Sequence, residues 1–177
     1  DPRYGDAYYK LGLTALRIND PVSAERALRR AFELLKPGPE RNDSASKLTD
    51  IYLAVYLADT RRGKTYETEL DDFMKRLPQG SFDRLRIEGL RAAKNGDLDG
   101  ALKSLEAANK LQPLDPRVVV PYAEALILKD RFPEAEKLAR DLIAKQKDFG
   151  PIYDLLYAQY LRRNRLEDAE QIRKLKA

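Results

Sequence analysis

Residues 94–113 read KNGDLDGALKSLEAANKLQP, a stretch that opens on a turn and closes on a proline. Its apolar residues fall three or four positions apart, as one face of a helix requires: Leu98, Ala101, Leu102, Leu105, Ala108 and Leu111. Two of these core positions are alanines, which bury little apolar area. Small residues at core positions indicate that a neighbouring helix passes very close to this one.

The same order of turn residues and apolar residues recurs along the chain. The positions equivalent to Ala101 are Ala135 and Ala169, at a spacing of about 34 residues, and the upstream equivalents are Ala24 and Tyr66. Each such helix follows another amphipathic segment and a short turn, with the turns near Asn19-Asp20, Gly96-Asp97, Asp130 and Asn164. No segment alternates with the period of a strand, so we predict an all-α chain of helix-turn-helix units.

These units resemble the tetratricopeptide repeat family. The first unit has Tyr8-x2-Leu11-Gly12, and the third has Gly89 followed by Ala101, Leu105, Ala108 and Pro113. The resemblance implies a right-handed α-solenoid of stacked repeats, of the kind found in bacterial arrays. It also implies that the glycines and alanines named here are small because helices cross at these positions.

We expect the whole of residues 1–177 to form one array. The expected repeats are 3–37, 45–78, 82–113, 116–147 and 150–177, the last of which includes a C-terminal cap. The second repeat diverges most and follows an inserted loop, 37–44. In that loop Pro37, Gly38 and Pro39 should stop one helix, and Asp43 or Ser44 should cap the next.

The first residues predict an exposed face at the N-terminal end of the array. Asp1-Pro2 has the spacing of the tail of a preceding repeat, as Pro113 has before the fourth unit. Without such a repeat, Tyr4, Tyr8 and Leu11 would lack neighbours. Apolar patches of this kind find partners, so we expect self-association through this face.

Composition narrows the possible chemistry. The chain has no histidine, cysteine or tryptophan and a net charge of +4. Histidine bases, thiolate nucleophiles and the usual zinc ligands are therefore missing, and we expect no enzyme activity, metal or cofactor. The acidic residues in 67–72 do not face one another on a helix and indicate a solvated surface.

The longest apolar run, Ile51 to Ala58, is too short for the roughly 20 residues that cross a bilayer. We therefore expect a soluble chain. The sequence leaves its location open between the bacterial cytoplasm and the periplasm or cell envelope.

The resemblance implies a non-enzymatic scaffold or adaptor that binds a peptide, helix or protein partner in a concave groove. First-helix residues turned away from the second helix should line this groove: Tyr9, Leu13, Leu16, Arg17, Ile51, Val55, Arg86, Leu90, Lys94, Val120, Glu124, Leu128, Asp154 and Arg162. An amphipathic partner would place its apolar side on Tyr9, Leu13 and Val55. Its acidic side would lie near Arg86 and Lys94.

Two other functions remain open. Arg61, Arg62 and Lys64 form the best basic patch for nucleic acid, although the chain's basic pairs are scattered among acids. The repeats also resemble bacterial envelope arrays that serve exopolysaccharide assembly, which would make the chain a scaffold of that machinery.

Overall fold

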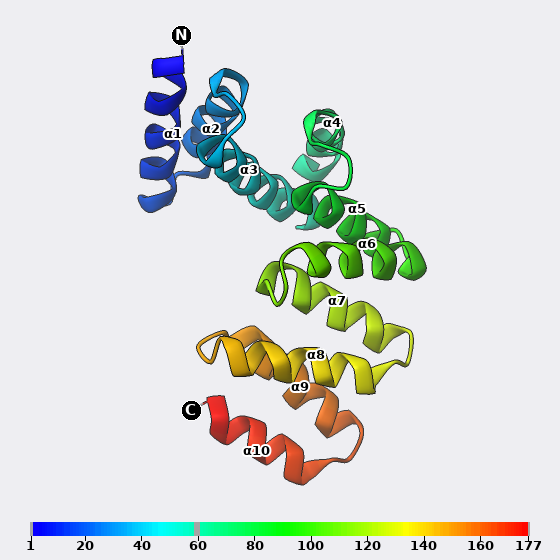
Figure 1. Cartoon of the computed structure of the whole chain (residues 1–177). Coiled ribbons are helices and arrows are strands. Elements are labelled where there is room, and N and C mark those ends of the chain that lie inside the picture. The colour runs from blue at the N-terminus through cyan, green and yellow to red at the C-terminus, as the bar shows by residue number, and fades with distance from the viewer. Residues whose placement is uncertain (1, 59–60, 177) are drawn as a thin grey trace. The chain divides into compact units, whose positions relative to one another are not determined.

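The computed structural model describes residues 2–58 and 61–176, with side chains described for 4–58 and 67–176. Over these residues the chain forms ten α-helices and no strand (Figure 1). The helices are α1 (Pro2–Arg17), α2 (Pro21–Leu34), α3 (Pro39–Leu57), α4 (Arg61–Arg76), α5 (Phe82–Lys94), α6 (Leu98–Leu111), α7 (Pro116–Leu128), α8 (Phe132–Lys145), α9 (Gly150–Arg162) and α10 (Leu166–Lys176). The predicted all-α fold of helix-turn-helix units is confirmed.

One turn geometry joins the two helices of four units. The turn residue has a positive φ in each: Asn19 (58°), Gly96 (81°), Asp130 (57°) and Asn164 (54°). The N–H of the following residue donates to the carbonyl five residues earlier, as in Asp97 to Ala92 and Arg131 to Leu126, at 2.9 and 2.8 Å. This geometry closes a helix by satisfying its last carbonyls. The predicted turns are therefore confirmed.

Small residues set the distance between the helices of a unit, as the sequence predicts. A Cβ atom on Gly12 of α1 would lie 2.6 Å from Cγ of Leu28 on α2. The same relation recurs between Gly89 and Leu105, at 2.7 Å. Ala101 and Ala108 on α6 are completely buried.

The chain divides into two compact units, Asp1–Ile87 and Glu88–Ala177. In the first unit, α1 packs on α2, α2 on α3 and α3 on α4 (Figure 1). Its core includes Phe32, Tyr52 and Phe73, whose rings contact one another with Phe73 in the middle; ring centroids lie 5.5 Å apart for Phe32–Phe73 and 5.2 Å for Tyr52–Phe73.

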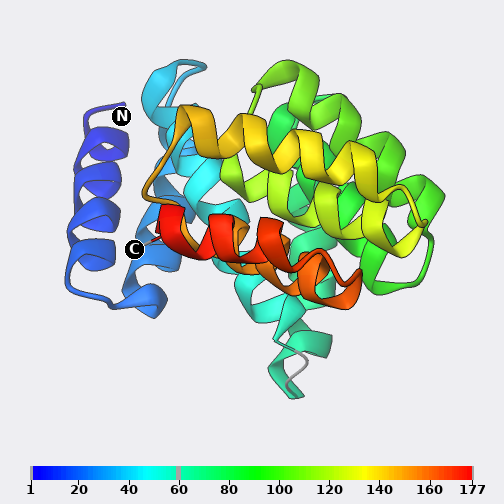
Figure 2. The same cartoon turned by 90° about the horizontal axis from the view of Figure 1, so that it is seen from below.

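The second unit continues the same packing. Figures 1 and 2 show α7, α8, α9 and α10 following one another, each in contact with the next. Its core gathers buried side chains from successive repeats, among them Val119, Leu142, Leu156, Tyr160 and Ile172.

The expected loop at 37–44 is largely helical, so that prediction is wrong. Helix α3 begins at Pro39, with Gly38 as its N-cap. Proline is tolerated in the first helical turn because its missing N–H would have no partner there. Ser44 and Ala45, expected at a helix start, are buried within the helix, and the Ser44 hydroxyl donates to the Glu40 carbonyl at 2.7 Å.

Tyr4, Tyr8 and Leu11 lie on α1 with exposed side chains, and self-association through them stays a prediction. Tyr4 and Leu11 are 63% and 54% exposed, and Tyr8 is 36% exposed. None of the helices within the described part of the chain is long and apolar enough to cross a membrane.

Candidate partner-binding groove

An open, mainly apolar groove of about 630 Å³ lies between the first helices of two successive repeats, α1 and α3. The start of α2 contributes Pro21 to its lining. Its lining residues come from these three helices: Leu16, Pro21, Lys47, Asp50, Ile51, Ala54, Val55 and Ala58. We call this surface the α1–α3 groove.

Small side chains on α3 make room for the groove. Ala54 and Ala58 lie four residues apart on one side of the helix, both exposed, with half-buried Ile51 and Val55 beside them. Tyr52, Leu53 and Tyr56 point away from the groove into the core. Helix α3 therefore has apolar residues on both faces, and the second face is left uncovered by the described residues.

One end of the α1–α3 groove is polar and fixed by hydrogen bonds. The Tyr9 hydroxyl of α1 donates to Asp43 of α3 at 2.8 Å, and Lys47 forms an ion pair with Asp43 at 3.2 Å. Partial burial, together with the bond to Asp43, raises the pKa of Tyr9 to about 12. Tyr9 is therefore a neutral donor that ties the two walls together.

Arg86 does not have the predicted role of a free cation facing a partner. It is only 3% exposed, its guanidinium lies 2.5 Å from Asp50 and 3.1 Å from Asp83, and it stacks near the Phe82 ring. These contacts come from α3 and α5. Arg86 instead holds Asp50 in place at the edge of the groove.

The structure gathers some of the other predicted residues at this groove. Leu16, Ile51 and Val55 line it, whereas Tyr9 lies outside the lining and bonds to Asp43, the ion-pair partner of the lining residue Lys47. Leu13 is half-buried and Arg17 is exposed on α1. Their contact with a partner stays a prediction.

The remaining predicted residues lie outside this groove, in the second unit. Leu90 and Lys94 are on α5, and Val120, Glu124 and Leu128 are on α7. Val120 packs against the core, Leu128 is 69% exposed, and partial desolvation raises the pKa of the exposed Glu124. Asp154 and Arg162 are exposed on α9.

Five residues that line the groove were not predicted from the sequence: Pro21, Lys47, Asp50, Ala54 and Ala58. A signal was present in the apolar run from residue 51 to residue 58. A helix that packs on one side needs only one apolar stripe, whereas this run is apolar on every side. The basic patch of Arg61, Arg62 and Lys64 lies outside the described side chains.

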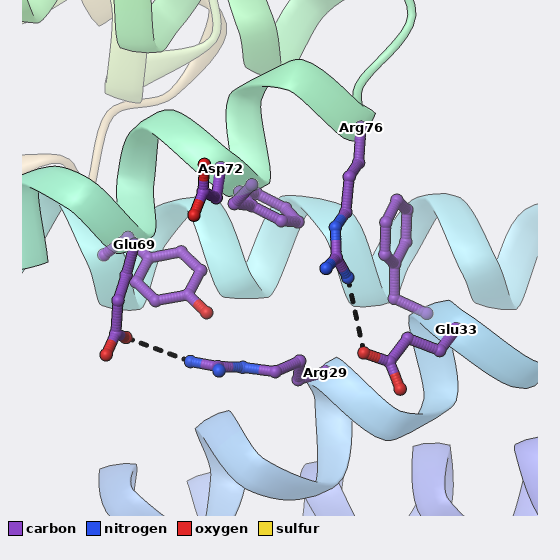
Figure 3. A pocket seen from close by; sticks show the side chains of 8 residues that line it. Arg29, Glu33, Glu69, Asp72 and Arg76 are labelled. Carbon is purple, nitrogen blue, oxygen red and sulfur yellow. Dashed lines mark hydrogen bonds and ion pairs between the residues drawn. The ribbon is translucent and has the colours of Figure 1, made fainter.

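A second, smaller pocket of about 150 Å³ lies between α2, α3 and α4. Its aromatic floor is Phe32, Tyr52 and Phe73, and charged residues form its rim. Figure 3 shows Arg29 pointing to Glu69 and Arg76 to Glu33, with the pairs 3.0 and 3.3 Å apart.

These cross-helix ion pairs fasten α4 to α2. Because each arginine already has a carboxylate partner, the pocket's charges are used within the fold. No cluster of three or more potential metal ligands occurs among the described side chains.

Comparison with known proteins agrees with this architecture. Residues 92–160 match the family model for the tetratricopeptide repeat. No curated protein matches the sequence significantly.

Solved structures share the fold. The chain is similar to TTC0263, a thermophilic tetratricopeptide-repeat protein of Thermus thermophilus, with a TM-score of 0.62 and 23% identity over 91% of this chain and 81% of that one. It is also similar to a MamA mutant (TM-score 0.56, 18% identity, 97% of this chain and 95% of that one) and to MamA AMB-1 (0.53, 18%, 99% and 91%). The sequence of residues 92–160 is thus similar to the tetratricopeptide repeat family, and the chain shares the helical-repeat fold of these solved proteins.

Proposed function

We propose that the chain is a non-enzymatic protein-interaction scaffold that binds a helical or extended segment of a protein partner in the α1–α3 groove. The observation that supports this most is the groove itself, an open apolar surface between the first helices of successive repeats. The general role of tetratricopeptide repeats is protein interaction, and such surfaces are the usual binding faces of repeat arrays.

The shape and polarity of the groove suggest the partner's chemistry. Ile51, Val55 and Leu16 offer an apolar floor, and the gap above Ala54 and Ala58 admits a side chain of the partner. The polar end, with Lys47 and Asp50, gives the partner a direction. Apolar anchors beside a polar flank are typical of the recognition of an amphipathic helix.

A groove-filling substitution tests the proposal. Peptides selected from a random library on the folded chain would be measured against the wild type and against Ala54→Leu, in which a larger side chain occupies the groove. The expected result is a loss of affinity of about tenfold or more, because a buried anchor contributes roughly 2 kcal/mol.

Ala158→Leu is the matched control, since Ala158 is exposed on α9 in the second unit. It should leave the affinity unchanged. Selected peptides that bind the Ala54→Leu chain as tightly as the wild type would place the binding site elsewhere.

A further inference from the structure

The turn that joins α5 to α6 contains an asparagine followed by a glycine. The asparagines of the chain are Asn19, Asn42, Asn95, Asn109 and Asn164. Only Asn95 precedes a glycine, Gly96. The Asn95 side chain is exposed, and its amide forms no hydrogen bond within the part of the chain that the structure describes. Asparagine is a thermolabile residue, because its side-chain amide reacts with the backbone nitrogen of the next residue.

The reaction at such a pair is a cyclisation followed by hydrolysis. The backbone nitrogen of Gly96 attacks Cγ of Asn95, its proton passes to the departing amide nitrogen, and ammonia leaves behind a succinimide ring. Solvent water then opens the ring. Opening at Cγ gives aspartate, whereas opening at the backbone carbonyl carbon gives isoaspartate, in which the main chain runs through the former side chain.

Gly96 keeps its backbone nitrogen accessible for this attack. It has no Cβ atom, its φ is 81°, and apart from its chain neighbours no described atom lies within 4 Å of the position a Cβ would take. Its N–H donates to the Ala93 carbonyl at 3.1 Å, at the exposed end of α5. Helix ends open locally at little cost in free energy, so this bond does not hold the nitrogen permanently.

Two turns of the same geometry offer a comparison within the chain. Asn19 and Asn164 are exposed as Asn95 is, but the residues after them are Asp20 and Arg165. The N–H groups of Asp20 and Arg165 donate to the carbonyl five residues earlier, both at 2.9 Å, and so close the preceding helix. Each of these nitrogens is therefore held by the turn and shielded by its own side chain, whereas the nitrogen of Gly96 is not shielded.

We infer that Asn95 is a site of spontaneous modification, at which conversion to isoaspartate opens the α5–α6 turn. Isoaspartate adds an extra carbon to the main chain just before Gly96. It therefore displaces the N–H groups of Gly96 and Asp97, which close α5 by donating to Ala93 and Ala92 at 3.1 and 2.9 Å. The reaction is independent of any function of the α1–α3 groove.

Ageing of the full chain tests the site. The purified chain would be kept at mildly alkaline pH, which favours attack by the amide nitrogen, and cleaved after glutamate at intervals. Mass spectrometry of the fragment 89–106 then measures the exchange of ammonia for water. Asn95 should convert about tenfold faster or more than Asn19 and Asn164 in the same sample, because glycine leaves the attacking nitrogen unshielded.

Two matched variants check that the signal comes from this asparagine. Glutamine keeps the amide but would have to close a larger ring, so Asn95→Gln should abolish the conversion in fragment 89–106. Asn164→Gln changes an asparagine in a turn of the same geometry. It should leave the rate at Asn95 unchanged.

The isoaspartate form, separated by ion exchange, tests the effect on the turn. Asn95→Asp is its control, because it carries the same added charge on a normal backbone. Hydrogen exchange at the Gly96 and Asp97 amides should be faster in the isoaspartate form than in Asn95→Asp. The amides of α9 should be equally protected in both.

Two results would overturn the inference. Conversion at Asn95 that is no faster than at Asn19 and Asn164 would show that this turn is not a preferred site. An isoaspartate form as well protected at Gly96 and Asp97 as Asn95→Asp would show that the modification does not open the turn.

Discussion

Single glycines decide how closely the helices of a unit approach. Gly12 and Gly89 lie where a leucine of the next helix fills the space of a Cβ atom. Gly12→Ala should destabilise the chain by about 1–3 kcal/mol, because overpacking outweighs the gain of roughly 0.5–1 kcal/mol in helix propensity. Chemical denaturation would measure the change in unfolding free energy.

Gly150→Ala is the matched substitution without crowding. Its nearest atom, a flexible carbon of Lys176, would lie 3.8 Å from the new Cβ. This variant should be as stable as the wild type or more stable. Equal destabilisation by both substitutions would mean that crowding at Gly12 is not the cause.

A glutamate and an arginine four residues apart recur on second helices and hold a tyrosine of the next helix. On α8, Glu136 accepts from the Tyr160 hydroxyl at 2.6 Å and Arg140 donates to the same hydroxyl at 2.8 Å. On α2, Arg29 pairs with Glu25 at 2.6 Å and lies over the Tyr52 ring. In both places the pair links a second helix to the first helix of the following repeat.

The environment of Glu136 on α8 predicts that the stability of the fold depends on pH. Burial alone would raise the pKa of Glu136, but hydrogen bonds from Arg165 and Tyr160 outweigh it and lower the pKa below the ordinary 4.5. A carboxyl whose pKa is lower in the folded state stabilises the fold at pH values above its unfolded-state pKa. That stabilisation is lost as the pH falls through the folded-state pKa.

Glu136→Gln removes the titrating group. Stability should then fall less steeply than in the wild type as the pH drops below about 4.5, while stability at pH 7 should be lower because the charged hydrogen bonds weaken. Urea unfolding at several pH values would measure both effects. Parallel wild-type and variant curves would show that Glu136 does not contribute.

At the scale of each compact unit, the helices pack mainly on their neighbours in sequence, α1 to α4 in the first unit and α6 to α10 in the second. Damage to one repeat should therefore stay local. In Gly12→Ala, hydrogen exchange should accelerate in α1 and α2 and remain slow in α9 and α10. A uniform acceleration along the chain would show that it unfolds as one cooperative unit.

The fold could be predicted from the sequence because its signals are local. Turn residues such as Asn164 indicate where two helices are joined, and small residues such as Ala101 indicate where they pack closely. The start of α3 and the role of Arg86 could not be predicted, because both depend on packing between segments far apart. Arg86 pairs with Asp50 of another helix, and the sequence next to either residue does not indicate this ion pair.

The candidate site was only partly predictable for a similar reason. Ile51 and Val55 follow from helix periodicity, whereas the depth of the α1–α3 groove comes from Ala54 and Ala58, and alanine alone carries no functional signal. The start of α2 at Pro21 completes the groove. Its contribution appears only when three helices are placed together.

Methyl NMR tests the central claim, partner binding in the α1–α3 groove, most directly. A peptide selected on the folded chain would be titrated while the isoleucine methyl signals are recorded. The Ile51 signal in the groove should shift with saturation, and that of Ile152, fully buried in the second unit, should stay in place. Saturating binding that leaves Ile51 unshifted would contradict the claim.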